Sequence, residues 1–179
     1  MNDLDRARLR LALNPRSVAV VGASDSPDKI GGRPLHFLSK FGFKGKVIPI
    51  NPNRRKVQGF KAVPALAELT EAPDVAIVAV PGELAVGAVE DCARLGVKLA
   101  VVMTSGFGEV GTPEGKAQEL RMVEAARRTG MRIVGPNSQG LANFGTGAVL
   151  SFSTMYLEMP PRDGPVGIVS QSGAMSVVP

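Results

Sequence analysis

The sequence predicts an α/β fold built around a parallel β-sheet, and three observations lead to this prediction. Short β-branched runs that end in glycine or proline alternate with stretches of helical periodicity, as in repeated βα units. The run at 74–80 is apolar after its first residue, which requires cover on both faces of a strand. The chain has 179 residues, 44% of them hydrophobic, which is enough for one such domain and the start of another.

The individual elements follow in order from these patterns. We expect five strands, at 17–22, 46–51, 74–80, 97–103 and 131–134. Pro49 lies in the second of them, and because proline cannot donate to a strand ladder, this strand belongs at an edge or a bulge. A first helix is expected at about 30–41. A second begins at Pro81 and ends at Gly96, and a third begins at 112–113 and ends at Gly130.

The C-terminal part of the chain has a different character. Residues 141–165 contain glycine, serine and proline with weak periodicity, which predicts a linker. A further strand at 166–169 runs into the small residues that follow, and this strand has no partner helix within the chain. We therefore expect one domain over 1–140, a linker over 141–165 and the truncated start of a second domain over 166–179.

Composition excludes several classes of protein. Cys92 is the single cysteine and His36 the single histidine, so an intramolecular disulfide, a multi-cysteine zinc site and a histidine-rich metal centre are all excluded. The N-terminus lacks the pattern of a signal peptide, and no apolar run approaches the roughly 18 residues of a membrane span. We expect a cytoplasmic protein without a membrane partner. The net charge is +5, but aromatic residues make up only 4%, which argues against a nucleic-acid partner.

A glycine-rich segment, 22–32, connects the first expected strand to the first expected helix. Such a turn exposes backbone N–H groups at the positive end of a helix, where a phosphate is well placed. The segment departs from the G-x-G-x-x-G pattern, since Ser24 stands at the second glycine. The predicted ligand contacts here are Gly22, Ala23, Ser24 and Ile30. An ordinary flexible turn is the alternative interpretation.

The charge pattern after this loop favours a ligand with several phosphates. A fold that binds NAD needs an acidic residue at the end of the second strand, where this chain has Asn51, and no acidic residue occurs between Asp28 and Glu68. The same interval contains nine basic residues: Lys29, Arg33, Lys40, Lys44, Lys46, Arg54, Arg55, Lys56 and Lys61. NADP and CoA both suit such a block. Asn51, Arg54 and Arg55 are predicted ligand contacts, with a solvated basic surface as the alternative.

Three more glycine-containing loops follow the third, fourth and fifth expected strands. In open α/β sheets the ligand lies in the crevice at the carboxyl ends of the strands, so these loops are expected to border the same site. The predicted contacts from them are Val80, Pro81, Thr104, Ser105, Gly106, Asn137 and Ser138.

Taken in order, these segments resemble the NDP-forming acyl-CoA synthetases, which are relatives of the succinyl-CoA synthetase alpha subunit and of ADP-forming acetyl-CoA synthetase. The segments that carry the resemblance are 14–24, 48–52, 79–81, 104–107, 135–140 and 170–173. The resemblance implies that the first domain is a Rossmann-like CoA-binding domain. It also implies that 166–179 opens a flavodoxin-like domain, in which Ser170, Gln171, Ser172 and Gly173 bind phosphate.

The resemblance further implies an acid–CoA ligase that makes or cleaves acyl-CoA through an acyl phosphate and a phosphohistidine. CoA or acyl-CoA would bind this chain. ATP or ADP and Mg would bind outside it, in the remaining domains or in a beta-type ATP-grasp subunit; a homo-oligomer stays open. The phosphorylated histidine of the family lies beyond Pro179, so this chain is expected to be inactive alone, without catalytic residues or metal ligands. His36 and Cys92 are interpreted as structural, and Ser138 stands where the family commonly has cysteine.

Two other functions stay open at this point. One is a regulatory module of a protein acetyltransferase that senses CoA or acyl-CoA. The other is an NADP-binding oxidoreductase domain, which the missing G-x-G-x-x-G pattern disfavours.

Overall fold

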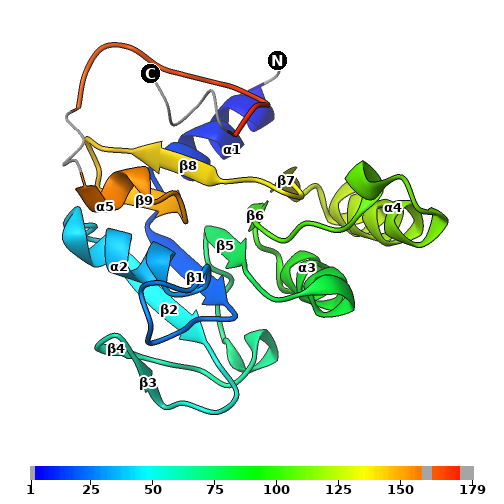
Figure 1. Cartoon of the computed structure of the whole chain (residues 1–179), viewed down its shortest axis with the longest axis horizontal. Coiled ribbons are helices and arrows are strands. Elements are labelled where there is room, and N and C mark those ends of the chain that lie inside the picture. Colours follow the sequence, from blue (N-terminus) through cyan, green and yellow to red (C-terminus); the bar gives the residue numbers. More distant parts are fainter. Residues whose placement is uncertain (1–2, 159–162, 174–179) are drawn as a thin grey trace.

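A computed structural model describes residues 3–158 and 163–173 (Figure 1). Its centre is a five-stranded, wholly parallel sheet in the order β2 (Lys46–Ile50), β1 (Ser17–Val21), β5 (Val75–Val78), β6 (Leu99–Val102) and β7 (Arg132–Val134). The chain runs from β1 to β2 on one side and then returns to β5 on the other side of β1. The strand order therefore reverses between β1 and β5, and the predicted fold class is confirmed.

Helices cover both faces of the sheet, because the strand residues alternate between two apolar clusters. Ala19 and Val21 of β1 lie in the cluster formed with α3 (Gly82–Leu95) and α4 (Pro113–Thr129). Val18 and Val20 lie in the opposite cluster, which includes Leu35 and Leu38 of α2 (Arg33–Lys40). A helix before the sheet, α1 (Asp3–Leu13), contributes Ala12 to this second cluster.

The residues predicted to begin and end the helices lie at the ends of the helices in the structure. Pro81 is the N-cap of α3, and Gly96 ends that helix in the left-handed conformation, with φ of 93°. The Thr112 hydroxyl caps α4 by accepting from the Gly115 N–H at 3.1 Å. Pro49 lies in β2, which is an edge strand of the sheet, where the missing N–H is tolerated.

The segment after β2 contains structure that the sequence analysis did not predict. Two short strands, β3 (Lys56–Val57) and β4 (Phe60–Lys61), form an antiparallel hairpin. Val63 then runs beside the end of β2, since its N–H donates to Pro49 O at 2.9 Å and its carbonyl accepts from Asn51 N at 3.0 Å. Two single turns of 3-10 helix follow in the chain, η1 (Leu66–Glu68) and η2 (Gly108–Val110).

The prediction of a linker over 141–165 is wrong for its first part, because residues 141–158 form a hairpin and a short helix. β8 (Gly140–Asn143) pairs with β9 (Ala148–Ser151), and a short helix, α5 (Met155–Glu158), follows. β9 packs on α2, and the Phe37 and Tyr156 rings meet edge to face with centroids 5.7 Å apart. The hairpin therefore extends the first domain beyond residue 140. Each of its strands has only four residues, which is too short for a periodicity argument to detect.

The strand expected at 166–169 is absent from the structure. Val166, Ile168 and Val169 are 81%, 74% and 102% exposed, since no other strand of the described chain lies beside them. Residues 170–173 are also irregular, and 174–179 lie outside the described residues. The end proposed for the linker and the limits proposed for the second domain stay predictions. None of the helices within the described ranges has the length and apolarity needed to cross a membrane.

Candidate functional site

A cavity of about 330 Å³ lies at the carboxyl ends of β5 and β6, beside the loop that follows β1. Its lining residues come from these three places: Ile30, Ala79, Val80, Pro81, Gly82, Met103, Thr104 and Ser105. The cavity borders the point where the strand order reverses, which is the usual ligand position in open α/β sheets. Five of the predicted contacts are brought together here, namely Ile30, Val80, Pro81, Thr104 and Ser105.

Three glycines let the β1–α2 loop approach the cavity and fold back on itself. Gly22 has φ of +83°, and a Cβ on it would lie only 2.6 Å from Ala79 O. A Cβ on Gly31 would lie 2.0 Å from Gly22 O, and one on Gly32 would lie 1.8 Å from Ser26 O. Such distances are too short for any side chain. The result is a bare backbone turn at the N-terminus of α2, the kind of surface that binds phosphate.

The Asn51 side chain holds this loop, and each of its two polar atoms makes a hydrogen bond within the protein. Its Nδ2 donates to Ala23 O at 2.8 Å, and its Oδ1 accepts from the Asn53 N–H at 2.8 Å. The sequence analysis assigned Asn51 to ligand contact. In the structure, Asn51 connects the end of β2 to the loop that contains Gly22, Ala23 and Ser24, and its contact with a ligand stays a prediction.

The β3–β4 hairpin forms a second connection to the loop. Gln58 Nε2 donates to Ser24 O at 2.7 Å and to Gly32 O at 2.9 Å, and its N–H donates to Asp25 Oδ1 at 2.8 Å. Arg54 forms an ion pair with Asp25 at 2.8 Å. The sequence analysis missed Gln58, because a neutral amide in a short turn carries no charge or motif signal. Arg54 pairs with an acid on the loop, and its expected contact with the ligand stays a prediction.

The loop after β6 is stabilised by the carboxylate of Glu109, which lies in the same loop. The Thr104 hydroxyl donates to Val80 O at 2.6 Å, which joins the β5 and β6 ends of the cavity wall. Glu109 accepts from the N–H groups of Gly106 and Phe107 at 2.6 and 3.0 Å. Partial burial alone would raise the pKa of Glu109, but these backbone donors outweigh it and lower the pKa. The Gly106 N–H is therefore paired within the loop, and the contact of Gly106 with a ligand stays a prediction.

The loop after β7 lies against the same end of β6. Asn137 N donates to Thr104 O at 2.9 Å, and Ser138 N donates to Val102 O at 3.2 Å. Gly135 has φ of +107°, and a Cβ on it would lie 2.4 Å from Val102 O, so a glycine is required for this approach. Asn137 and Ser138 thus sit next to the cavity without being among its lining residues.

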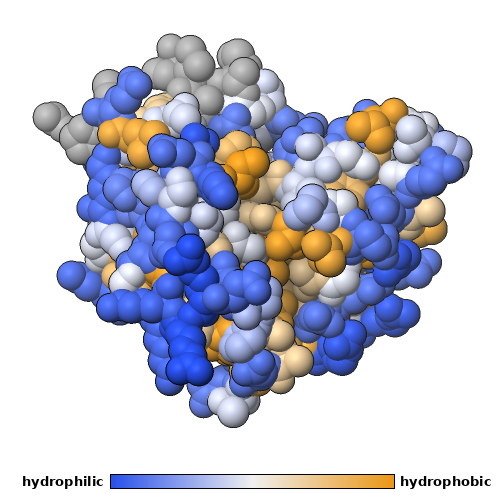
Figure 2. Space-filling view, turned by 60° about the horizontal axis from the view of Figure 1, so that its bottom comes forward, coloured by the Kyte–Doolittle hydropathy of each residue, from blue (hydrophilic) through white to orange (hydrophobic). Residues whose placement is uncertain are grey.

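Seven of the nine basic residues divide into two groups, and the other two, Lys44 and Lys46, are exposed at the start of β2, at the opposite end of the sheet. Arg33 and Lys40 hold the β9–α5 region, since Arg33 Nη1 donates to Phe152 O at 3.0 Å and Lys40 Nζ donates to Tyr156 O at 2.9 Å. The cations at the loop and hairpin are exposed: Lys29, Arg54, Arg55, Lys56 and Lys61. In Figure 2, the side on which the β3–β4 hairpin lies is the most strongly hydrophilic part of the face shown, and apolar surface is visible next to it. The block is therefore only partly available to a ligand.

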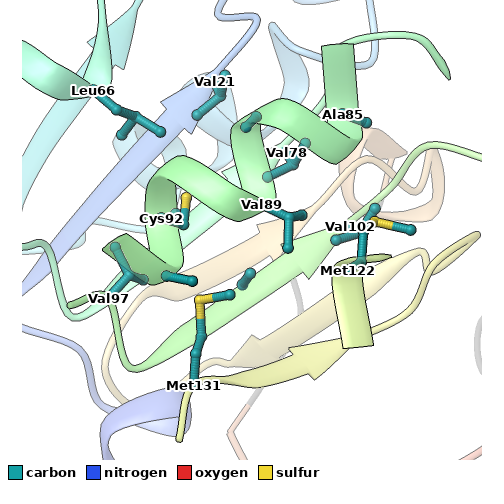
Figure 3. Close-up of a cluster of buried hydrophobic side chains, with 14 of the residues drawn as sticks. Val21, Leu66, Val78, Ala85, Val89, Cys92, Val97, Val102, Met122 and Met131 are labelled. Carbon is teal, nitrogen blue, oxygen red and sulfur yellow. The ribbon is translucent and has the colours of Figure 1, made fainter. Parts of the chain in front are cut away.

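His36 and Cys92 lie away from the cavity lining. The half-buried His36 ring is on α2, 5.8 Å from the Phe37 ring. Cys92 of α3 is fully buried between that helix and the sheet, next to Val89 and Val97 (Figure 3), and burial raises its thiol pKa to about 12. Across residues 3–158 and 163–173, His, Cys, Asp and Glu side chains form no group of three that could hold a metal ion.

Comparison with known proteins identifies the family. The family described as CoA binding domain matches residues 16–143, which include the five strands of the parallel sheet and all the lining residues of the cavity. This chain belongs to the CoA binding domain family. The predicted resemblance is confirmed by relatives and by solved structures.

Three curated relatives share this CoA binding domain. The acetate–CoA ligase [ADP-forming] I subunit alpha of Pyrococcus furiosus is 38% identical over 94% of this chain and 36% of its own length. A trans-feruloyl-CoA synthase of an unknown prokaryotic organism is 37% identical over 93% of this chain and 24% of its own. The 4-hydroxybutyrate–CoA ligase [ADP-forming] of Nitrosopumilus maritimus is 32% identical over 91% and 23%. The chain thus spans about a quarter to a third of these relatives.

Two solved structures have the same fold over nearly the whole chain. One is the dinucleotide-forming acetyl-coenzyme A synthetase 1 of Ca. Korarchaeum cryptofilum in complex with phosphate and ADP, with a TM-score of 0.81, 40% identity, and coverage of 94% of this chain and 35% of that one. The other is PH0766 of Pyrococcus horikoshii OT3, with a TM-score of 0.85, 38% identity, and coverage of 94% and 37%. These likenesses confirm the predicted Rossmann-like fold of the CoA binding domain.

Proposed function

We propose that this chain is the CoA-binding part of an NDP-forming acid–CoA ligase, which makes or cleaves acyl-CoA through an acyl phosphate and a phosphohistidine. The observation that carries the proposal is the position of the cavity. It lies where β1, β5 and β6 end, and it is lined from the loops that the family resemblance assigns to CoA. The cavity lies entirely within the segment that matches the CoA binding domain family.

The chemistry of the cavity suits the different parts of CoA. The diphosphate would approach the turn at Gly22, Gly31 and Gly32, where no side chain stands in the way and the positive end of the α2 dipole favours an anion. The exposed cations of the loop and hairpin would favour the 3′-phosphate. Ile30, Val80 and Met103 would offer apolar surface to the less polar parts of the molecule.

The named relatives support the assignment of CoA binding to this domain and of acid binding to the rest of the protein. They act on acetate, ferulate and 4-hydroxybutyrate, yet all align with this chain over nine-tenths of its length. CoA is common to the three reactions, whereas the acid differs. We infer that this chain binds CoA, and that the acid pocket, the ATP or ADP site with Mg, and the phosphohistidine lie in further domains or in a beta-type ATP-grasp subunit of a cytoplasmic enzyme.

Calorimetry with three ligands tests the proposal. CoA is expected to bind the chain, and dephospho-CoA to bind about tenfold more weakly, because one charge-assisted contact set is lost. NADP is expected to bind more weakly than CoA. Tighter binding of NADP, or equal affinity for CoA and dephospho-CoA, would contradict the assignment of the cavity and its cations to CoA.

The exposed cations are tested with matched variants. Arg55→Gln and Lys61→Gln should each reduce the preference for CoA over dephospho-CoA. Lys98→Gln is the control, since Lys98 is exposed just before β6, at the opposite end of the sheet. It should leave the preference unchanged.

A further inference from the structure

Gln58 occupies an unusual backbone position for its residue type. Gln58 and Gly59 are the two central residues of the β3–β4 turn, with φ of 47° and 89°. Two-residue hairpin turns with both φ values positive prefer asparagine or aspartate followed by glycine, because a longer side chain is less well tolerated in the left-handed region. Turn geometry therefore does not account for a glutamine here, and the contacts of its side chain become informative.

The Gln58 side chain connects the two ends of the β1–α2 loop. Its Nε2 donates to Ser24 O at 2.7 Å and to Gly32 O at 2.9 Å, so both amide hydrogens are used. Ser24 follows the end of β1, and Gly32 is the N-cap of α2. One side chain thus bonds to both ends of the loop, which are also joined by the hydrogen bond from Ser24 N to Gly31 O at 3.3 Å. Its own N–H adds a third bond, to Asp25 Oδ1 at 2.8 Å.

On its inner side, the loop is held by Asn51 and by the bonds of Gly22 N and Ala23 N to Ile50 O, but its outer side has few contacts besides Gln58. Residues 25 and 27–30 are exposed, and Ala23 is the loop residue that belongs to an apolar cluster. The ion pair between Asp25 and Arg54 is also exposed, and such pairs stabilise weakly. The bridge made by Gln58 is therefore the main connection between the hairpin and the loop.

We propose that Gln58 is a positioning residue, which orders the β1–α2 loop before the ligand arrives. The proposal rests on the proposed function, because the loop is where the CoA diphosphate would bind. A loop that is already ordered binds its ligand without the entropic cost of ordering at that moment. Gln58 itself touches the loop and not the ligand.

Two substitutions separate this role from simple stabilisation of the hairpin. Gln58→Asn provides a residue that the turn prefers, but its amide is one methylene shorter and cannot reach both carbonyls. Gln58→Met keeps the length of the side chain and removes both donors. Gln118→Met is the control, since it removes one exposed hydrogen bond to Glu83 on the α3–α4 surface. Thermal unfolding of each variant checks that the fold persists.

The readouts are calorimetry with CoA and amide hydrogen exchange of the free chain over residues 22–32. Both Gln58 variants are expected to bind CoA about tenfold more weakly and to exchange faster in this segment, while Gln58→Asn keeps the melting temperature of the wild type. Gln118→Met should match the wild type in both measurements. Wild-type affinity and exchange in Gln58→Asn would overturn the positioning role. A wild-type chain that fails to bind CoA would contradict the proposed function instead, and unchanged exchange over 22–32 would still overturn the role of Gln58.

Discussion

The side-chain amide of Asn51 donates to the carbonyl oxygen of Ala23 at 2.8 Å, from the end of β2 to the loop after β1. In folds of this type that bind NAD, the end of the second strand carries an acidic residue that holds the ribose hydroxyls. Asn51 has no carboxylate, and its carbonyl oxygen already accepts from the Asn53 N–H. The residue at the position that would bind the ribose of NAD thus holds the glycine-rich loop. The absence of a carboxylate at this position favours CoA over NAD.

Substitution of Gly22 should damage both the fold and the site. Gly22→Ala places a Cβ 2.6 Å from Ala79 O at a φ of +83°, so it combines backbone strain with a steric clash. We expect a loss of about 2–4 kcal/mol in the free energy of unfolding, by denaturant titration, and loss of CoA binding by calorimetry.

Gly42→Ala is the matched control for this substitution. Gly42 also has a positive φ, +70°, but nothing lies within 4 Å of an added Cβ. It should cost about 1 kcal/mol and leave CoA binding intact. Equal losses of stability in the two variants would mean that the close approach of Gly22 to Ala79 contributes nothing.

Most of the fold could be predicted because its signals are local. The continuous apolar run at 75–78, the proline and glycine boundaries of α3, and the edge position of Pro49 each follow from one physical rule applied to neighbouring residues. The positions of the site loops followed in turn, since the ends of parallel strands meet at one edge.

The parts that could not be predicted depend on contacts between distant residues. Gln58 reaches Ser24 across 34 positions, and Tyr156 meets Phe37 across an even larger separation. The same applies to the basic block, where charge alone could not show that Arg33 and Lys40 hold backbone carbonyls of the β9–α5 region. Contacts between residues far apart in the sequence cannot be predicted from periodicity or from motifs.

The folded hairpin and α5 can be tested through Tyr156. Its ring is buried against Phe37, Phe41 and Phe144. Tyr156→Ala should reduce the free energy of unfolding by about 3 kcal/mol, because it removes a buried aromatic ring and leaves a cavity. Leu157→Ala is the control, since the Leu157 side chain is exposed, and it should change stability by less than about 0.5 kcal/mol. A Tyr156→Ala variant as stable as the wild type would restore the interpretation of this segment as a linker.

Cys92 should make stability depend on pH in the alkaline range. Burial raises the pKa of the folded thiol from 9.0 to about 12, so the unfolded chain loses this proton first as the pH rises. The contribution is fully present below pH 9 and is lost between pH 9 and about 12, with about 1.4 kcal/mol lost by pH 10. Denaturant titrations at pH 7 to 10 should show this decline in the wild type.

Cys92→Ala isolates the thiol from other groups that titrate in this range. The variant should be less stable at every pH, because it leaves a small cavity in the core, but its stability should fall less steeply above pH 9. In the native chain, Cys92 should also resist thiol reagents at neutral pH and react once the chain is unfolded. Parallel pH profiles for the two proteins would show that the thiol titrates alike in both states.

The last prediction is that the chain binds CoA without catalysing acyl-CoA formation. The proposed reaction needs a histidine that carries phosphate between sites, and His36 is the single histidine present. His36 lies on α2 beside Phe37, and it is not among the lining residues of the cavity. Incubation with labelled ATP, CoA and acetate should give no acyl-CoA, and His36→Ala should bind CoA as the wild type does. Acyl-CoA formation that disappears in His36→Ala would instead give this histidine a catalytic role that its position on α2 argues against.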